Sequence, residues 1–155
     1  MNKYKSWSGL KKQLSSFLCD SLKDKISYFY TTYHEVHNAY GRATISYNKK
    51  ELVAFSWVEM YEQEYDMYDN PKEELKDKWM MECTLCEKDF LKSVTTYLNT
   101  DVQTALTSDD YLLKVFAFMD KRVGKRTLVK IKNEVEKLPE WVKEFYNIRC
   151  KEENI

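Results

Sequence analysis

The pattern of apolar and polar positions divides the first third of the chain into one helix and several strands. Between Trp7 and Leu22, apolar side chains recur every three or four residues, which predicts an amphipathic helix. Residues with high β propensity dominate Ile26–Val36 and predict a strand. Alternation over Arg42–Tyr47 and Glu51–Trp57 predicts two more strands, joined by a hairpin turn at 48–50. These strands form a predicted antiparallel meander that the first helix could cover.

Helical spacing returns after Pro71 and continues through the second half of the chain. The predicted helical segments are Lys72–Leu98, Asp101–Leu106, a helix from about Ser108 to Lys121, Thr127–Lys137 and Glu140–Arg149. The polar group Thr107–Asp110 has the residue types that cap the start of a helix. We expect Gly124 to close the third of these helices and Lys151–Ile155 to be a frayed tail.

Together these elements predict an α+β fold with an N-terminal helix, a three-stranded antiparallel meander and a helical C-terminal half. We expect one domain over residues 1–155, with the helix and meander at about 6–58 and the helical part at about 71–149. One aromatic-rich core should join the two parts. Its expected members are Trp7, Phe29, Ile45, Phe55, Leu113, Phe116, Leu128, Trp141 and Phe145.

Charge is unevenly distributed along a chain whose net charge is zero. Lys and Arg outnumber Asp and Glu by nine to three in residues 1–50 and by eleven to seven in 111–155, whereas the ratio is five to fifteen in 51–110. Overall neutrality disfavours a nucleic-acid-binding domain, which usually carries a basic excess. The sequence shows neither an apolar signal segment nor a stretch of membrane-spanning length. We therefore expect a cytoplasmic protein with reduced thiols and no membrane contact.

An acidic, tyrosine-rich segment lies in the middle of the chain. Its predicted partner-binding residues are Tyr61, Glu62, Glu64, Tyr65, Asp66 and Tyr68. Tyrosine offers a large amphipathic contact area, and the carboxylates favour a basic partner such as the nucleic-acid cleft of a nuclease. The alternative is that the tyrosines cover the sheet or neighbouring helices while the acids face water.

A second charged feature is the basic corner, Asp120–Arg126, at the junction of two predicted helices. Its four cations are Lys121, Arg122, Lys125 and Arg126. They could complement the end of the preceding helix, dock an acidic protein, or contact a phosphate backbone together with Arg42. Because Lys125 and Arg126 open the next helix, where the dipole disfavours cations, an anion is expected near them.

Two pairs of residues have the spacing of metal ligands, His34 with His37 and Cys83 with Cys86. A His₂Cys₂ set suits tetrahedral zinc, but the histidines point to opposite faces if the strand continues. The cysteines fall within a helical pattern, which favours a role as small core residues. A redox role needs a thiolate at the start of a helix, whereas this pair is predicted inside one and beside two glutamates. We therefore assign no metal.

The sequence offers little for catalysis. Two histidines limit general acid–base chemistry, and three glycines spread over the chain cannot form a phosphate-cradling loop. No Gly-x-Ser-x-Gly elbow for a nucleophilic serine is present. We therefore expect a protein that is not an enzyme and needs no cofactor.

Several segments together resemble one known family. They are the N-terminal Trp7-Ser8-x-Leu10-Lys11-Lys12 pattern, Gly41-Arg42-Ala43, Lys49-Lys50-Glu51, the basic corner, and Phe145-Tyr146 near the end. In these segments the chain resembles an uncharacterised family of small bacterial cytosolic proteins. The resemblance covers most of the chain except the acidic middle. It implies a shared fold and a bacterial, intracellular setting, and it carries over no catalytic or binding residue.

The function that these observations favour is binding of a protein partner. The specific hypothesis is an immunity or antitoxin-like protein whose acidic, tyrosine-rich segment occupies the basic site of a toxin. The alternative is a nucleic-acid-binding accessory protein that uses the basic corner. The sequence leaves open which partner is bound and how many copies of the chain assemble.

Overall fold

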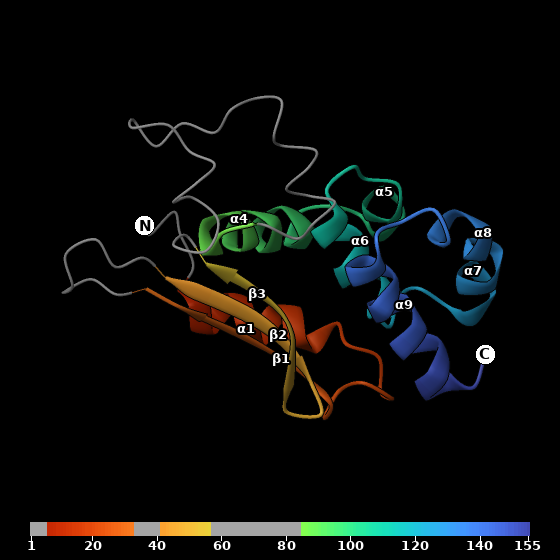
Figure 1. Cartoon of the computed structure of the whole chain (residues 1–155), viewed down its shortest axis with the longest axis horizontal. Helices are drawn as coiled ribbons and strands as arrows, with labels where there is room; N and C mark the ends of the chain where they lie inside the picture. The colour runs from red at the N-terminus through yellow and green to blue at the C-terminus, as the bar shows by residue number, and fades with distance from the viewer. Residues whose placement is uncertain (1–5, 33–40, 57–84) are drawn as a thin grey trace.

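A computed structural model describes residues 6–32, 41–56 and 85–155 of the chain (Figure 1). The elements in chain order are α1 (Trp7–Ser16), β1 (Ile26–Thr31), β2 (Arg42–Tyr47), β3 (Lys50–Ser56), α4 (Glu87–Leu98), α5 (Val102–Leu106), α6 (Tyr111–Phe118), α7 (Lys125–Lys130), α8 (Lys132–Val135) and α9 (Glu140–Glu153). An N-terminal helix, a three-stranded antiparallel sheet and a helical C-terminal half confirm the predicted α+β fold.

The sheet has the predicted meander order, β1-β2-β3, with both neighbouring pairs antiparallel. Between β2 and β3, Asn48 and Lys49 have φ values of 50° and 68°. Two consecutive left-handed residues form the tight turn whose twist matches that of the flanking strands, and Asn tolerates this conformation well. The predicted hairpin turn is therefore confirmed.

The two faces of the sheet differ in burial because side chains alternate along a strand. Tyr28 is buried and lies opposite Ile45 in the register of the first pair. Phe29 lies opposite Thr44 on the other face and is 48% exposed. The prediction of Phe29 as a core residue is therefore wrong, since β propensity alone cannot tell which of two adjacent aromatic residues points inward.

Helices α1 and α4 pack against the sheet, and aromatic rings fill the space between the layers. Phe90 of α4 stacks on Phe55 of β3 with ring centroids 5.4 Å apart, and it meets Phe116 of α6 edge to face at 6.2 Å. Trp7 packs at the edge of this cluster, 5.8 Å from Phe90. The buried residues of the sheet and of the helices belong to one hydrophobic cluster.

The central helix α6 starts where the sequence predicts a cap, because the Asp110 carboxylate accepts a hydrogen bond from the Leu112 amide at 2.9 Å. Six of its eight residues are buried, and it packs against α4, α5 and α9. It ends at Phe118, earlier than the predicted Lys121. A helix that is apolar on nearly all sides has to lie inside the molecule.

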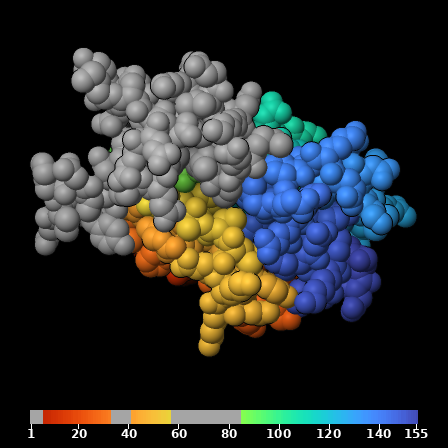
Figure 2. All heavy atoms as spheres, viewed as in Figure 1, coloured from red at the N-terminus to blue at the C-terminus, as the bar shows by residue number. Residues whose placement is uncertain are grey.

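Three predictions for the helical half are wrong. Gly124 does not close α6 with a left-handed residue, because its φ is −86° and it is the N-cap of α7. The predicted helix Thr127–Lys137 is divided between α7 and α8 at Ile131. The expected frayed tail is the last turn of α9, where Glu152 contacts the hairpin side chain Tyr47. Figure 2 shows hairpin and C-terminal atoms side by side on one face.

Gly41 and Gly124 offer a matched test of the packing. A Cβ atom on Gly41 would lie 2.2 Å from the Thr31 carbonyl oxygen and 2.7 Å from Cγ of Glu87, whereas one on Gly124 meets nothing within 4 Å. We expect Gly41→Ala to lower the free energy of unfolding by about 1–3 kcal/mol. Gly124→Ala meets no clash and loses only a preferred N-cap residue, so it should cost less than about 1 kcal/mol. Urea unfolding of both variants measures this, and equal losses would contradict the packing around Gly41.

Candidate functional site

The basic corner is fixed by contacts with the segment that follows α1. Leu18 and Asp120 face each other in an antiparallel bridge, and the Lys121 amide donates a hydrogen bond to the Phe17 carbonyl at 2.7 Å. These backbone contacts end α1 at Ser16, although its apolar pattern continues to Leu22. The corner is therefore attached to the N-terminal part of the fold as well as to the helical half.

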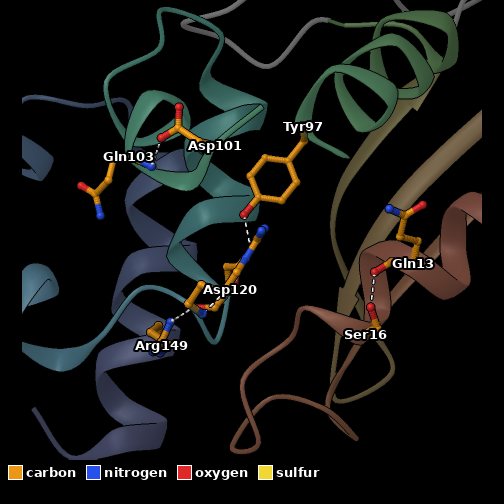
Figure 3. Close-up of polar contacts among 8 residues, drawn as sticks. Gln13, Ser16, Tyr97, Asp101, Gln103, Asp120 and Arg149 are labelled. Atoms are coloured by element: carbon orange, nitrogen blue, oxygen red, sulfur yellow. Dashed lines mark hydrogen bonds and ion pairs between the residues drawn. The ribbon is translucent and has the colours of Figure 1, made fainter. Parts of the chain in front are cut away.

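A buried carboxylate lies at the centre of the corner. Asp120 is 1% exposed, and it accepts hydrogen bonds from the Tyr97 hydroxyl and from the Arg122 amide at 2.8 Å. Figure 3 shows Tyr97 of α4 pointing toward Asp120. Burial, followed by the hydrogen bond to Asp120, raises the pKa of Tyr97, which keeps its hydroxyl protonated as a donor.

Arg122 belongs to this internal network and not to the free cations of the corner. Its Nη2 atom pairs with Asp120 at 2.7 Å, and its guanidinium carbon lies 3.8 Å from the centre of the Phe17 ring. The hydrogen bond to Asp120 raises the pKa of Arg122. A carboxylate on one side and an aromatic face on the other hold the guanidinium in place.

Arg149 of α9 completes the network from the opposite side (Figure 3). It is 2% exposed, and its guanidinium donates to the carbonyls of Phe118 at 2.8 Å, Asp120 at 2.9 Å and Val123 at 2.6 Å. Its Nε atom lies 3.0 Å from a carboxylate oxygen of Glu153. Because carbonyls at the end of a helix have no partner within the helix, Arg149 supplies a donor to the Phe118 carbonyl at the end of α6. It gives the Asp120 carbonyl a second donor beside the Val123 amide.

The remaining cations near the corner are exposed. We call the group formed by Lys121, Lys125, Arg126, Lys130 and the apolar Val129 the basic surface. All four cations are exposed, and Val129 is 62% exposed. In the part of the chain that the structure describes, none of the four forms an ion pair with a carboxylate. Lys125 and Arg126 lie in the first turn of α7, where the helix dipole disfavours cations. Arg126 and Lys130 are like charges four residues apart on the same helix, which also lowers stability. The arrangement of these cations is therefore locally unfavourable for the fold.

Arg42 does not join the basic surface. It lies at the start of β2 and forms two hydrogen bonds with Glu51 of β3, at 2.8 and 2.6 Å. Figure 1 places the sheet and α7 at opposite ends of the molecule. The structure therefore does not bring Arg42 together with the basic corner, because the fold separates the two segments that carry them.

Several predicted site residues lie outside the described residues: Tyr61, Glu62, Glu64, Tyr65, Asp66, Tyr68, His34, His37 and Cys83. Cys86 is described, and the prediction that it lies inside a helix is wrong, because it is the buried N-cap of α4. Within the described ranges, no group of three or more His, Cys, Asp or Glu residues could hold a metal ion.

The sequence reasoning missed Tyr97 and Arg149. Tyr97 follows Phe90 and Val94 at helical spacing, so the pattern could have placed it on the buried face of α4. Arg149 lies beside Ile148 on a helix with a buried face, and a cation at such a position indicates a buried partner. The partners themselves are backbone carbonyls, which no sequence pattern marks.

A family match covers the sheet, the basic corner and nearly all of α9. The family's sequence model matches residues 6–150. The chain belongs to the SF0329 protein family. This family has no known function, which confirms the resemblance to an uncharacterised family. No curated protein and no solved structure matches the chain.

Across the described ranges, no helix is both long enough and apolar enough to cross a bilayer.

Removing the Asp120 carboxylate tests the internal network. We expect Asp120→Ala to lower the free energy of unfolding by about 3 kcal/mol, because it leaves the buried Tyr97 hydroxyl without an acceptor and Arg122 without its carboxylate. Glu51→Ala breaks the exposed pair with Arg42 and should cost less than about 1 kcal/mol. Denaturant unfolding compares the two, and equal losses would contradict a central role for Asp120.

The contact of Glu152 with Lys25 and Tyr47 predicts a dependence on pH. The hydrogen bonds from Lys25 and Tyr47 lower the pKa of Glu152 below its ordinary 4.5. The stability that this carboxylate adds is therefore complete above pH 4.5 and is lost as pH falls through its folded-state pKa. We expect the difference in unfolding free energy between the wild type and Glu152→Gln to shrink below that pH. A difference that stays constant down to about pH 2 would contradict the assignment.

Proposed function

We propose that this protein is not an enzyme and acts by binding an acidic protein partner through the basic surface. The observation that carries the proposal is the group Lys121, Lys125, Arg126 and Lys130, exposed around Val129 without a described carboxylate partner. Charged residues around an apolar contact correspond to the polar rim and apolar centre of protein interfaces. An acidic partner would offset the repulsion among the four cations.

The hydrogen bonds that hold the backbone beneath the basic surface favour binding without rearrangement. The backbone of Lys121 is held by the Phe17 carbonyl, and Arg149 holds the carbonyl of Val123 immediately before α7. A docking surface that is rigid before contact loses less entropy when a partner binds. The network of Asp120 and Arg149 thus orients the basic surface without taking part in binding.

A phosphate backbone is the second candidate, favoured by one specific observation. Every ionisable side chain from residue 121 to residue 132 is a cation. Three features favour a protein: the net charge is zero, the exposed Val129 contributes nothing to phosphate binding, and Arg122 already pairs with Asp120. Arginine is the side chain best suited to bidentate phosphate contacts, and in Arg122 the Nε and Nη2 donors already bind Asp120.

The immunity-like hypothesis concerns the acidic, tyrosine-rich segment and a basic partner, and it stays a prediction from the sequence. Five basic against fifteen acidic residues in 51–110 support a basic partner for that segment. We infer a cytoplasmic setting for either role, and the free thiols of Cys19 and Cys150 support it.

Charge reversal with a matched control tests the basic surface. The full chain is immobilised as wild type and as the double variant Lys125→Glu/Arg126→Glu, and is exposed to nuclease-treated lysate of the source cells. The control is Lys11→Glu/Lys12→Glu, which reverses two adjacent exposed cations on α1. We expect an acidic protein to bind the wild type and the control, and to bind the double variant at least about tenfold more weakly, because like charges across an interface repel.

The other outcomes identify which alternative holds. Retention of the same partner by Lys125→Glu/Arg126→Glu, or equal loss in the control, would overturn the proposal. Binding that disappears with nuclease and weakens steeply with salt would assign the surface to nucleic acid. A basic protein released only by Glu62→Lys/Glu64→Lys would support the immunity-like hypothesis instead.

A further inference from the structure

A cleft separates α5 and α6 from the α7–α8 pair, and Lys130 is the one residue that it shares with the basic surface. Its volume is about 630 Å³, within the range of small-molecule sites. Buried Leu106, Phe118 and Val135 are among its lining residues, and half-buried Ile131 and Leu138 add to its apolar surface. A ligand in this cleft would therefore meet apolar side chains from several elements.

Lys114 of α6 brings one half-buried cation into this apolar lining. Its Nζ atom donates a hydrogen bond to the Leu106 carbonyl at 2.7 Å, at the C-terminal end of α5. Burial lowers the pKa of Lys114, while the charges of Asp109 and Glu134 oppose this shift. An ammonium group carries three N–H donors, and the carbonyl takes one of them. The other two are available to a ligand with acceptor oxygens.

The charges that line the cleft favour an anion. Besides Lys114, the exposed Lys130 lines it, and the structure shows no ion pair of Lys130 with a described carboxylate. Glu134 is the one carboxylate among the lining residues, and Lys137 lies 3.7 Å from it. Among the lining side chains, two lysines thus face one carboxylate that already has a lysine neighbour, while Asp109 lies near Lys114 outside the lining.

We propose that this cleft binds a small organic carboxylate with an apolar body. The carboxylate accepts hydrogen bonds from Lys114, and the body lies against Phe118, Ile131 and Leu138. A charged hydrogen bond in a partly dry site is stronger than one in water, and burial of the body adds the hydrophobic contribution. Inorganic phosphate lacks the apolar part, and a neutral apolar molecule leaves the ammonium without an acceptor. The ligand's carboxylate is bound by Lys114, which is not part of the basic surface, so binding in the cleft does not require a partner protein on that surface.

The test uses octanoate as the probe and octanol as its neutral match, both well below the concentration at which octanoate forms micelles. Binding to the full chain is measured by calorimetry and by ¹H–¹⁵N chemical shifts. We expect octanoate to bind saturably and about tenfold more tightly than octanol, with the largest shifts at amides around Leu106 and Ile131. Octanoate that binds no more tightly than octanol, or shifts that lie elsewhere, would overturn the proposal.

Variants of Lys114 separate its charge from its packing. Lys114→Met keeps an unbranched apolar stem and should remove the advantage of octanoate over octanol, whereas Lys114→Arg should retain most of it. Lys92→Met removes an exposed cation on α4 as the control and should leave octanoate binding unchanged. An unaltered octanoate affinity in folded Lys114→Met would overturn the proposal. Should Lys114→Met fail to fold, Lys114→Arg and the comparison of octanoate with octanol in the wild type decide it.

Discussion

The buried carboxylate of Asp120 is the interaction on which the rest of the structure depends. The carboxylate binds Tyr97 of α4 and Arg122 within the corner, and the backbone of the same residue forms the bridge to Leu18 in the segment after α1. A buried charge is unfavourable unless it is paired and hydrogen-bonded, and here the hydroxyl, the guanidinium and a backbone amide all donate to it. Its position therefore fixes how the helical half sits against the N-terminal part.

This constraint divides the cations near the corner into two groups with different roles. Arg122 and Arg149 are held by a carboxylate, an aromatic ring and backbone carbonyls, so they serve the fold. Lys125, Arg126 and Lys130 extend from a short helix, at positions where their mutual repulsion lowers stability. Cations that pair with Asp120 or with backbone carbonyls thus stabilise the fold of the corner, whereas the exposed cations of α7 lower its stability. Such local conflicts are common at functional sites, where binding and not folding sets the choice of residue.

The sequence located the candidate site more accurately than it described its geometry. Helix-cap chemistry and a cluster of cations were enough to place a basic corner at Asp120–Arg126. The pattern did not show that Arg122 pairs with Asp120, or that Tyr97 and Arg149 approach from other helices to meet Asp120. It also grouped Arg42 with the corner, although Glu51 holds that side chain on the sheet. Sign of charge is visible along the chain, whereas distance between charges depends on how the elements pack.

What the sequence determined by itself is local in origin. The Asn48-Lys49 turn, the Asp110 cap and the alternation along β2 depend on residues close together in the chain, so their patterns can be recognised without a fold. Tertiary structure decided the rest. Helix α1 stops at Ser16, because the chain beyond it pairs with the corner instead of continuing its own hydrogen bonds. The last turn of α9 is held in place because Glu152 finds its partners Lys25 and Tyr47 in the N-terminal part of the chain. In each case a distant partner supplies free energy that local propensity lacks, and only the assembled fold brings that partner within reach.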